Sequence, residues 1–368
     1  MRKAGGQSAL LDRRAFLRMA GAAWAAALTP QAAFALSRTN AVFASGYKTA
    51  GGSFGIAVLA EDGSVIERTP LPARSHGMAF STATNHLVAF ARRPGTFALV
   101  IDHSGKTQPI TIAATENRHF FGHGCFSPDG TLLYASENDF DANRGVIGLY
   151  DARDNYRRIG EYQTYGIGTH DLSVSDDGTL LIAANGGIET HPDFGRTKLN
   201  LDHMEPSLAL IDAKTGALVE RHALPEKLRQ LSTRHIDLDD KGRIWFACQY
   251  EGPRNDLPPL VGHFGKGEDL TFLSLPEDTT IGLANYVGAI AVNRREGLVG
   301  LTSPNGGRFV VLDAKTGGVL RDESVTDAAG IARAPHGFAV SSYDGDFAGR
   351  RDDVAWDQHI TSLISRSA

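Results

Sequence analysis

The sequence predicts an all-β fold, a β-propeller of six four-stranded blades, and three observations point to it. Short apolar runs recur with turn residues between them, a histidine–glycine phrase returns at a regular spacing, and the two chain ends hold incomplete repeat units. The composition agrees, because 41 Gly and 15 Pro in 368 residues indicate a turn-rich chain. Helix-period stretches are scarce after residue 36.

The apolar runs are typical of short strands joined by tight turns. Runs such as HLVAFA, TLLYASE, TLLIAAN and RIWFACQ are rich in Val, Ile, Leu and Phe, as strands are. Similar turn sequences come directly before three of them: SPDG at 127–130, SDDG at 175–178 and DDKG at 239–242. Two longer segments, IDAKTGALVE at 211–220 and LDAKTGGVLR at 312–321, are nearly identical. The chain is therefore a tandem repeat.

Five histidines begin apolar runs and define the period of the repeat: His76, His123, His170, His235 and His336. The first two intervals are equal, since 123 − 76 = 47 and 170 − 123 = 47. The next interval is longer because residues 185–206 interrupt a hairpin, and a further unit begins at Gly288 without a histidine. Periods of about 40 to 50 residues are typical of propeller blades, each with about four strands.

The chain ends are expected to close the propeller. Residues 41–70 resemble the second to fourth strands of a unit, whereas residues 336–342 resemble a first strand alone. Pairing them would complete one blade and remove exposed sheet edges. This count gives six blades in a single domain over residues 36–368, with seven as the alternative if residues 185–206 or 276–287 hold further strands.

The N-terminus has the features of an export signal. The segment DRRAFLR, Asp12 to Arg18, is a twin-arginine pattern, and Ala33-Phe34-Ala35 is a small-residue cleavage site. We expect residues 1–35 to be a twin-arginine (Tat) signal peptide and the mature protein to lie in the periplasm. The Tat pathway carries folded proteins, often with a metal installed, which favours a bound metal. No later apolar stretch approaches the roughly 20 residues that a membrane helix needs.

Charge and cysteine content exclude some classes of function. The chain has a net charge of −5, a pI near 6.2 and no basic run in its body. It therefore lacks the positively charged region that a nucleic-acid-binding protein needs. Cys125 and Cys248 lie in apolar runs, so we expect two buried residues in separate blades rather than a disulfide. The sequence has no nucleophile elbow, zinc-protease, phosphate-loop or haem-attachment motif. We expect a monomer.

The repeated histidines are the candidate metal ligands. In a propeller the first strand of each blade lines the central channel, so the five histidines should form a ring at one mouth of it, with Gly288 breaking the ring. Neutral imidazole is a common ligand for Zn, Cu, Fe and Ni, and iron or copper is the metal we expect here. A structural role, with each imidazole bonded to the backbone of the neighbouring blade, stays open.

Charged residues near these histidines are candidates for supporting the metal ligands or for contacting a bound ligand directly. Four basic residues stand close to them in the sequence: Arg74, Arg118, His119 and Arg234. An electropositive mouth would favour an anion such as a carboxylate, a phosphate or a chelated metal. Glu137 and Asp139 in the segment SENDFD, and Glu189 with His191, add acidic and histidine side chains in loops expected on one face.

These features together resemble a family of exported bacterial β-propellers classed as a domain of unknown function. The resemblance is carried by the twin-arginine signal, the repeated HG strand starts, SPDGTLLYASEND and IDAKTG, and it covers essentially the whole mature chain. Members of that family tend to be encoded with imelysin-like periplasmic iron-uptake proteins and a di-haem oxidoreductase-like protein. The resemblance therefore implies a role in iron acquisition and iron-uptake proteins as partners, without assigning a reaction.

Three functions remain in view. The leading one is a non-catalytic periplasmic propeller that binds a metal, a metal chelate or a partner protein through its histidine-lined mouth. The second is a lactonase or phosphoesterase with a central Ca²⁺ and a histidine base. That site needs several oxygen ligands on the axis, whereas the expected ring is rich in imidazole. The third is a pure interaction scaffold, in which histidine substitutions would change stability only.

Overall fold

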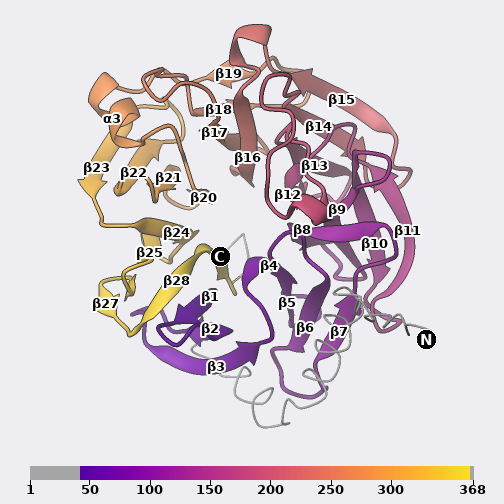
Figure 1. The fold of residues 1–368 in the computed structure, drawn as a ribbon. Helices are drawn as coiled ribbons and strands as arrows, with labels where there is room; N and C mark the ends of the chain where they lie inside the picture. Colours follow the sequence, from indigo (N-terminus) through magenta and orange to yellow (C-terminus); the bar gives the residue numbers. More distant parts are fainter. Residues whose placement is uncertain (1–41, 365–368) are drawn as a thin grey trace, which may run out of the picture.

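The computed structural model describes residues 42–364, which form seven four-stranded antiparallel sheets around a central axis (Figure 1). The prediction of an all-β propeller with four-stranded blades is confirmed, whereas the count of six blades is wrong. The helices of this part of the chain are short: α3 (Glu277–Gly282), η1 (Pro192–Phe194) and η2 (Glu226–Leu228). The expected signal peptide, residues 1–35, lies outside the described residues.

The blades are numbered here along the chain, with the innermost strand given first. Blade 1 consists of β28 (Val354–Ser362), β1 (Phe43–Thr49), β2 (Phe54–Leu59) and β3 (Val65–Leu71). Blade 2 consists of β4 (Ser75–Ser81), β5 (His86–Ala91), β6 (Phe97–Asp102) and β7 (Ile110–Ala113). Blade 3 consists of β8 (Arg118–Phe126), β9 (Leu132–Asp139), β10 (Arg144–Asp151) and β11 (Arg157–Gln163).

The remaining four blades follow the same pattern. Blade 4 consists of β12 (Thr169–Val174), β13 (Leu180–Asn185), β14 (Ser207–Asp212) and β15 (Leu218–Ala223). Blade 5 consists of β16 (Leu231–Leu238), β17 (Ile244–Tyr250), β18 (Val261–Phe264) and β19 (Thr271–Phe272). Blade 6 consists of β20 (Ala289–Asn293), β21 (Leu298–Ser303), β22 (Arg308–Asp313) and β23 (Val319–Ser324). Blade 7 consists of β24 (Ala328–Arg333), β25 (Phe338–Ser342), β26 (Asp346–Phe347) and β27 (Arg350–Arg351).

The additional blade comes from residues 328–351, a segment in which no complete repeat unit is expected from the sequence. Residues 185–206 and 276–287, the segments suspected of hiding strands, add none between β13 and β14 or between β19 and β20. The run expected as the first strand of the closing blade is instead β25, the second strand of blade 7. The outer strands β26 and β27 have two residues each, which is too short to read as an apolar run.

The chain ends close the propeller, as expected. The C-terminal strand β28 pairs antiparallel with β1, so blade 1 combines one C-terminal strand with three N-terminal ones. The strand that does this spans residues 354–362, not the expected 336–342. The innermost strands of neighbouring blades contact one another in the order β28, β4, β8, β12, β16, β20, β24 and back to β28. Figure 1 shows these strands surrounding the axis.

The hydrophobic core lies between the blades. One buried cluster joins Leu210 of blade 4, Phe246 of blade 5 and Leu301 of blade 6, because each sheet buries its faces against its neighbours. Cys125 in blade 3 and Cys248 in blade 5 are buried, and within residues 42–364 neither forms a disulfide, which confirms the prediction for both. No helix in residues 42–364 has the length and apolar character needed to cross a membrane.

Candidate functional site

Five histidines meet on the axis of the propeller and are called here the histidine cluster. Each comes from the innermost strand of a different blade: His76 (β4), His123 (β8), His170 (β12), His235 (β16) and His359 (β28). Neighbouring imidazole centroids lie 4.5 to 5.5 Å apart. Four of the side chains are buried and His359 is partly buried. The structure thus brings together four of the five histidines expected from the sequence.

His336 does not belong to the cluster, so its predicted place is wrong. It lies in the turn between β24 and β25, where its side chain is 78% exposed and faces Glu296 at 3.4 Å. The histidine–glycine phrase serves a different purpose here, because Gly337 provides the positive φ of 61° that the turn requires. His359, at the end of the chain, takes the position on the axis.

β-Bulges accompany the cluster histidines on their strands. In the four inner strands of blades 2 to 5, the pairing register shifts at or beside the histidine. The pairing of β28 with β1 also shifts, between the partners Trp356 and Ile360 that flank His359. A bulge changes the direction in which a side chain leaves the strand, so these shifts help to aim the imidazoles at the axis. Strand β20 pairs without a shift and carries no histidine.

Two glycines allow the imidazoles of His76 and His123 to approach within a centroid distance of 4.8 Å. A Cβ on Gly77 would lie 2.6 Å from Nδ1 of His123. A Cβ on Gly122, which has a φ of +111°, would lie 2.6 Å from Cδ2 of His76. The packing of the cluster therefore requires glycine at these two positions, whereas Gly124, which follows His123 in the repeated phrase, packs against Phe90 and Tyr134.

Four of the five cluster histidines are held in their neutral form at neutral pH. Burial first, and then neighbouring positive groups, hold the pKa values of His76, His170 and His359 well below 6.5. Burial also lowers the pKa of His235 to about 4, although the carboxylate of Asp171 opposes that shift. Neutral imidazoles keep a nitrogen lone pair, which is what a metal ligand requires.

Asp171 orients two of the imidazoles. Its Oδ1 lies 3.3 Å from Nδ1 of His123, and its Oδ2 lies 3.8 Å from Nδ1 of His235. The two histidines outweigh the effect of burial and hold the pKa of Asp171 well below its usual range. A carboxylate beside Nδ1–H leaves the Nε2 lone pair available, and this arrangement is the usual one around metal-bound histidines.

His170 is constrained differently. Nη1 of Arg234 lies 3.1 Å from Nδ1 of His170, and a guanidinium can only donate. Nδ1 of His170 therefore accepts, and its Nε2 carries the proton. In this tautomer Nε2 of His170 cannot bind a metal. Arg234 itself is anchored by Glu251, at 3.2 Å.

Two overlapping sets of histidines could share one ion. One ring nitrogen from each member lies within 4.8 Å of the others in the sets His123, His235, His359 and His76, His123, His170. Ligands about 2.0–2.1 Å from one Zn²⁺ are at most about 4.2 Å apart, so small imidazole rotations would close either set around an ion. The tautomer of His170 favours the first set. Within residues 42–364 both candidate sets consist of histidines alone.

The histidine cluster separates two cavities in the channel. The wide cavity, ≈ 560 Å³, is lined by His123, Asp171, His235 and His359 and extends along the C-terminal parts of the inner strands. The arginine cavity, ≈ 80 Å³, lies against His76 and His170. Its lining consists of ten residues: His76, Arg92, Arg93, His170, Arg196, Lys198, Arg234, Gln249, Tyr286 and Gln358.

Of the four basic residues predicted near the histidines, only Arg234 lines one of the two cavities beside the cluster. Arg234 lines the arginine cavity, whereas Arg74 makes a two-pronged pair with Asp357, at 2.7 and 2.8 Å. Arg118 lies in blade 3, where it pairs with Asp139 and Glu161, each at 3.0 Å. His119 stacks between the rings of Phe121 and Phe140. Neither Arg118 nor His119 lines the cavities beside the cluster.

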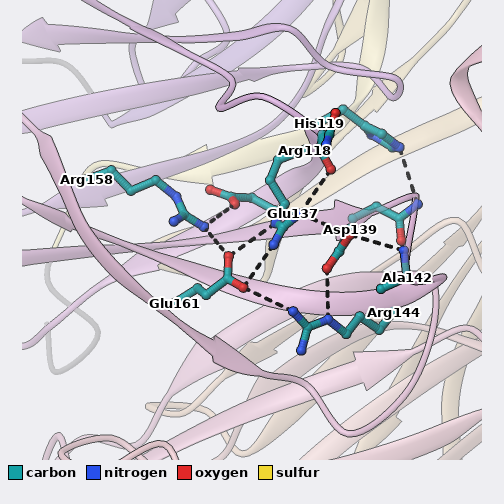
Figure 2. A network of polar contacts seen from close by, with 10 residues as sticks. Arg118, His119, Glu137, Asp139, Ala142, Arg144, Arg158 and Glu161 are labelled. Atoms are coloured by element: carbon teal, nitrogen blue, oxygen red, sulfur yellow. Dashed lines mark hydrogen bonds and ion pairs between the residues drawn. The ribbon is translucent and has the colours of Figure 1, made fainter.

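The predicted acidic residues belong to what we call the blade 3 network: Arg118, Glu137, Asp139, Arg144, Arg158 and Glu161 (Figure 2). Glu137 is buried, accepts from Tyr150 at 2.5 Å and pairs with Arg158 at 2.8 Å. Asp139 pairs with Arg144 at 2.8 Å. These carboxylates are thus bound to arginines of their own blade and do not face the channel cavities.

The insertion that carries Glu189 and His191 contacts the segment SENDFD. The expectation that Glu137 and Asp139 lie in a loop is wrong, because both belong to strand β9. Nδ2 of Asn138 donates to the carbonyl of Thr190 at 3.3 Å, and Phe140 packs on His191 with ring centroids 5.3 Å apart. The same insertion brings Arg196 and Lys198 to the arginine cavity.

A family model described as "Protein of unknown function (DUF1513)" matches residues 69–363. The chain belongs to this family. No curated protein sequence matches it.

Among solved structures, the DUF1513 protein is similar to Kuenenia stuttgartiensis hydrazine synthase, with a TM-score of 0.59 and 16% identity over 84% of this chain and 90% of that one. It is also similar to the β-propeller domain of Cps50 (Swd1) from Myceliophteria thermophila, with a TM-score of 0.58 and 10% identity over 87% and 97% of the two chains. At these identities the likeness shows the propeller fold alone.

Sequence reasoning missed several residues around the cluster of this DUF1513 protein. His359 follows no repeated phrase, and Asp171, although it directly follows His170, has no counterpart at the other repeat histidines that would single it out. The adjacent pair Arg92 and Arg93 follows the apolar run of β5 and is visible as ARRPG, but nothing local places it at the axis. Arg196 lies in an insertion outside the repeat, so the period gives no information about it.

Proposed function

We propose that this DUF1513 protein is a periplasmic metal-binding propeller of iron acquisition that holds iron or copper in its histidine cluster. One observation carries the proposal: His123, His235 and His359 converge on the axis beside Asp171, which lies against Nδ1 of two of them. The proposed role is to bind a metal, or a small metal chelate, without transforming it.

The chemistry of the donor set favours borderline transition metals. Three imidazoles, two of them in contact with the carboxylate of Asp171, suit Cu, Zn, Ni and Fe(II) as a ligand set. Ca²⁺ requires oxygen ligands instead. This counts against the calcium-dependent hydrolase considered from the sequence. The wide cavity borders the same three histidines, so it offers room for water or for part of a chelator to complete the coordination. A site with three protein ligands and open positions can exchange its metal.

Location and partners are proposed from the sequence. The twin-arginine pattern and the cleavage site support export by the Tat pathway to the periplasm. The family resemblance supports periplasmic iron-uptake proteins as partners. A monomeric state stays a prediction.

Metal binding by untagged protein tests the proposal. Protein stripped with EDTA would be titrated by calorimetry with Cu²⁺, Zn²⁺ and, without oxygen, Fe²⁺, and metal in freshly purified protein would be measured by mass spectrometry. We expect one metal ion per chain. Loss of a residue that hydrogen-bonds to a metal ligand typically lowers metal affinity about 10–100-fold. H123A and H359A remove a proposed ligand itself, so we expect each to lower metal affinity by about 100-fold or more.

The matched control is H336A, because this exposed histidine lies outside the cluster and its loss should leave metal affinity unchanged. Absence of bound iron, copper and zinc, or equal affinity in H123A and the parent protein, would contradict the proposal. If the histidine substitutions changed only the free energy of unfolding, the scaffold function would be favoured.

A further inference from the structure

We propose that the arginine cavity is a binding site for a small oxyanion of the phosphate class. It lies on the opposite side of the histidine cluster from the wide cavity, and its lining brings together side chains from several blades and from the insertion between β13 and β14. The proposal goes beyond metal binding and does not require a metal in the cluster.

The lining is cationic without an acidic counterpart. Five of its ten residues are basic, namely Arg92, Arg93, Arg196, Lys198 and Arg234, and none is Asp or Glu. Lys198 and Arg234 share the carboxylate of Glu251. The other three basic residues, Arg92, Arg93 and Arg196, form no ion pair with a carboxylate within residues 42–364. The cavity therefore holds an excess of positive charge.

The arginines also disfavour one another. Burial, followed by the charges of Arg234, Arg196 and Arg92, lowers the pKa of Arg93 to about 9. Desolvation against the cavity wall and the neighbouring arginines likewise lower the pKa values of Arg92 and Arg196, although much of the Arg196 side chain is exposed to solvent. A guanidinium nevertheless remains protonated at neutral pH. The repulsion is therefore present in the folded protein, and an anion in the cavity would relieve it.

Several buried nitrogen atoms of the lining have no hydrogen-bond partner; the guanidinium nitrogens among them are donors, whereas the role of Nδ1 of His76 depends on its tautomer. Nε and Nη1 of Arg92, Nε of Arg234 and Nδ1 of His76 are buried and lack a hydrogen-bond partner. Arg234 and His76 are only 6% and 5% exposed. Buried donors without acceptors destabilise a fold and are rare unless a ligand or water supplies the acceptor. The oxygens of a phosphate would supply several acceptors at once.

Size and geometry select the class of anion. A volume of ≈ 80 Å³ is room for roughly five to eight water-sized positions, which suits the five heavy atoms of phosphate and excludes a large chelator. The cations arrive from separate elements: Arg92 and Arg93 follow β5, Arg234 lies on β16, and Arg196 lies in the insertion. Donors from several directions fit a tetrahedral anion, whereas a planar carboxylate is matched by a single guanidinium fork.

Calorimetry on metal-free protein tests the site. EDTA-treated protein in a chloride buffer without phosphate would be titrated with inorganic phosphate, sulfate and glycerol 3-phosphate. We expect one phosphate per chain. Removing one charge-assisted partner should weaken binding at least about tenfold in R92Q and in R196Q. The control is R153Q, because Arg153 is exposed and paired with Asp151 in blade 3, and it should bind phosphate as the parent does.

Each outcome decides the proposal. If the protein binds phosphate and sulfate but not glycerol 3-phosphate, the ligand is a free inorganic oxyanion. If it also binds glycerol 3-phosphate, and R196Q loses that binding, the ligand is a phosphate group on a larger molecule. No phosphate binding at millimolar concentration, or unchanged binding in both R92Q and R196Q, would overturn it. Unfolding curves check that the variants fold, and Arg196 is exposed, so its loss should not disturb the core. Because this experiment uses metal-free protein, a failure to bind phosphate would not contradict the proposed metal binding. A failure to bind metal would likewise not contradict the phosphate site.

Discussion

The histidine cluster and the blade 3 network are both dense groups of titratable side chains, but they differ in how their charges are matched. In the network, three arginines face three carboxylates through short ion pairs. In the cluster, only two of the five imidazoles, those of His123 and His235, contact the carboxylate of Asp171. Two others border the arginine cavity, where three arginines form no ion pair with a carboxylate within residues 42–364. A satisfied network stabilises its own blade, whereas unsatisfied buried groups indicate a place for a ligand.

The two regions also differ in how the chain assembles them. The network draws on residues 118–161, which form one blade and are close in sequence. The cluster draws on five blades and on both ends of the domain. Local pairing can form within a single sheet, whereas the cluster exists only when the blades are arranged around the axis.

The largest effect is expected from E137A in the blade 3 network. Glu137 is 2% exposed, and its loss would leave Arg158 with only Glu161 and Tyr150 without an acceptor. Removing one partner of a buried pair costs about 3–5 kcal/mol, and we expect a loss in unfolding free energy near the lower end. Urea unfolding measures it, and metal affinity should not change.

The control for E137A is R157A, which removes an exposed ion pair with Asp154 and should leave stability unchanged. If E137A lowered metal affinity while leaving stability intact, the division between a structural network and a ligand site would be wrong.

A smaller effect, on binding rather than stability, is expected from D171N. Without the carboxylate, His123 and His235 lose the group that orients them, and such outer partners typically contribute about 10–100-fold in metal affinity. The matched control is D237N. Asp237 accepts the backbone N–H groups of Leu238 and Val292, much as Asp171 accepts those of Leu172 and Ile236.

In the described residues Asp237 has no ion pair with a histidine, so D237N should share any loss of stability but keep its metal affinity. Equal metal affinities in D171N and D237N would show that Asp171 does not act through the imidazoles.

The smallest effect is expected from E161Q as a function of pH. Burial raises the pKa of Glu161, but Arg118 and Arg158 outweigh burial and lower it to about 2, from 4.5 for a free carboxyl. The ionised carboxylate therefore stabilises the fold above pH 4.5, and this contribution is lost as the pH falls toward 2. The stability difference between parent and E161Q should shrink across that window, as urea unfolding would show. A difference that stayed constant with pH would mean that Glu161 does not contribute through its charge.

Much of the architecture could be predicted from the sequence because the repeat is regular. The interval of 47 residues places His76, His123 and His170 at equivalent positions, and the structure puts each on an innermost strand. The chain ends could be predicted to share a blade. The seventh blade could not be counted, because β26 and β27 are two residues long and leave no periodic signal.

The site was predictable only where it follows the repeat. His336 carries the repeated phrase but uses its glycine for a turn, whereas His359 reaches the axis from a strand without that phrase. Arg196 reaches the arginine cavity from an insertion. Such convergence depends on the closure of the propeller and on tertiary contacts that no local pattern encodes.

Strand β28 supplies both the seam that joins the chain ends and the imidazole of His359. The favoured triad of histidines is consequently incomplete until β28 has been synthesised and has docked against β1. A chain without β28 would contain most of the blades yet lack one imidazole of this triad.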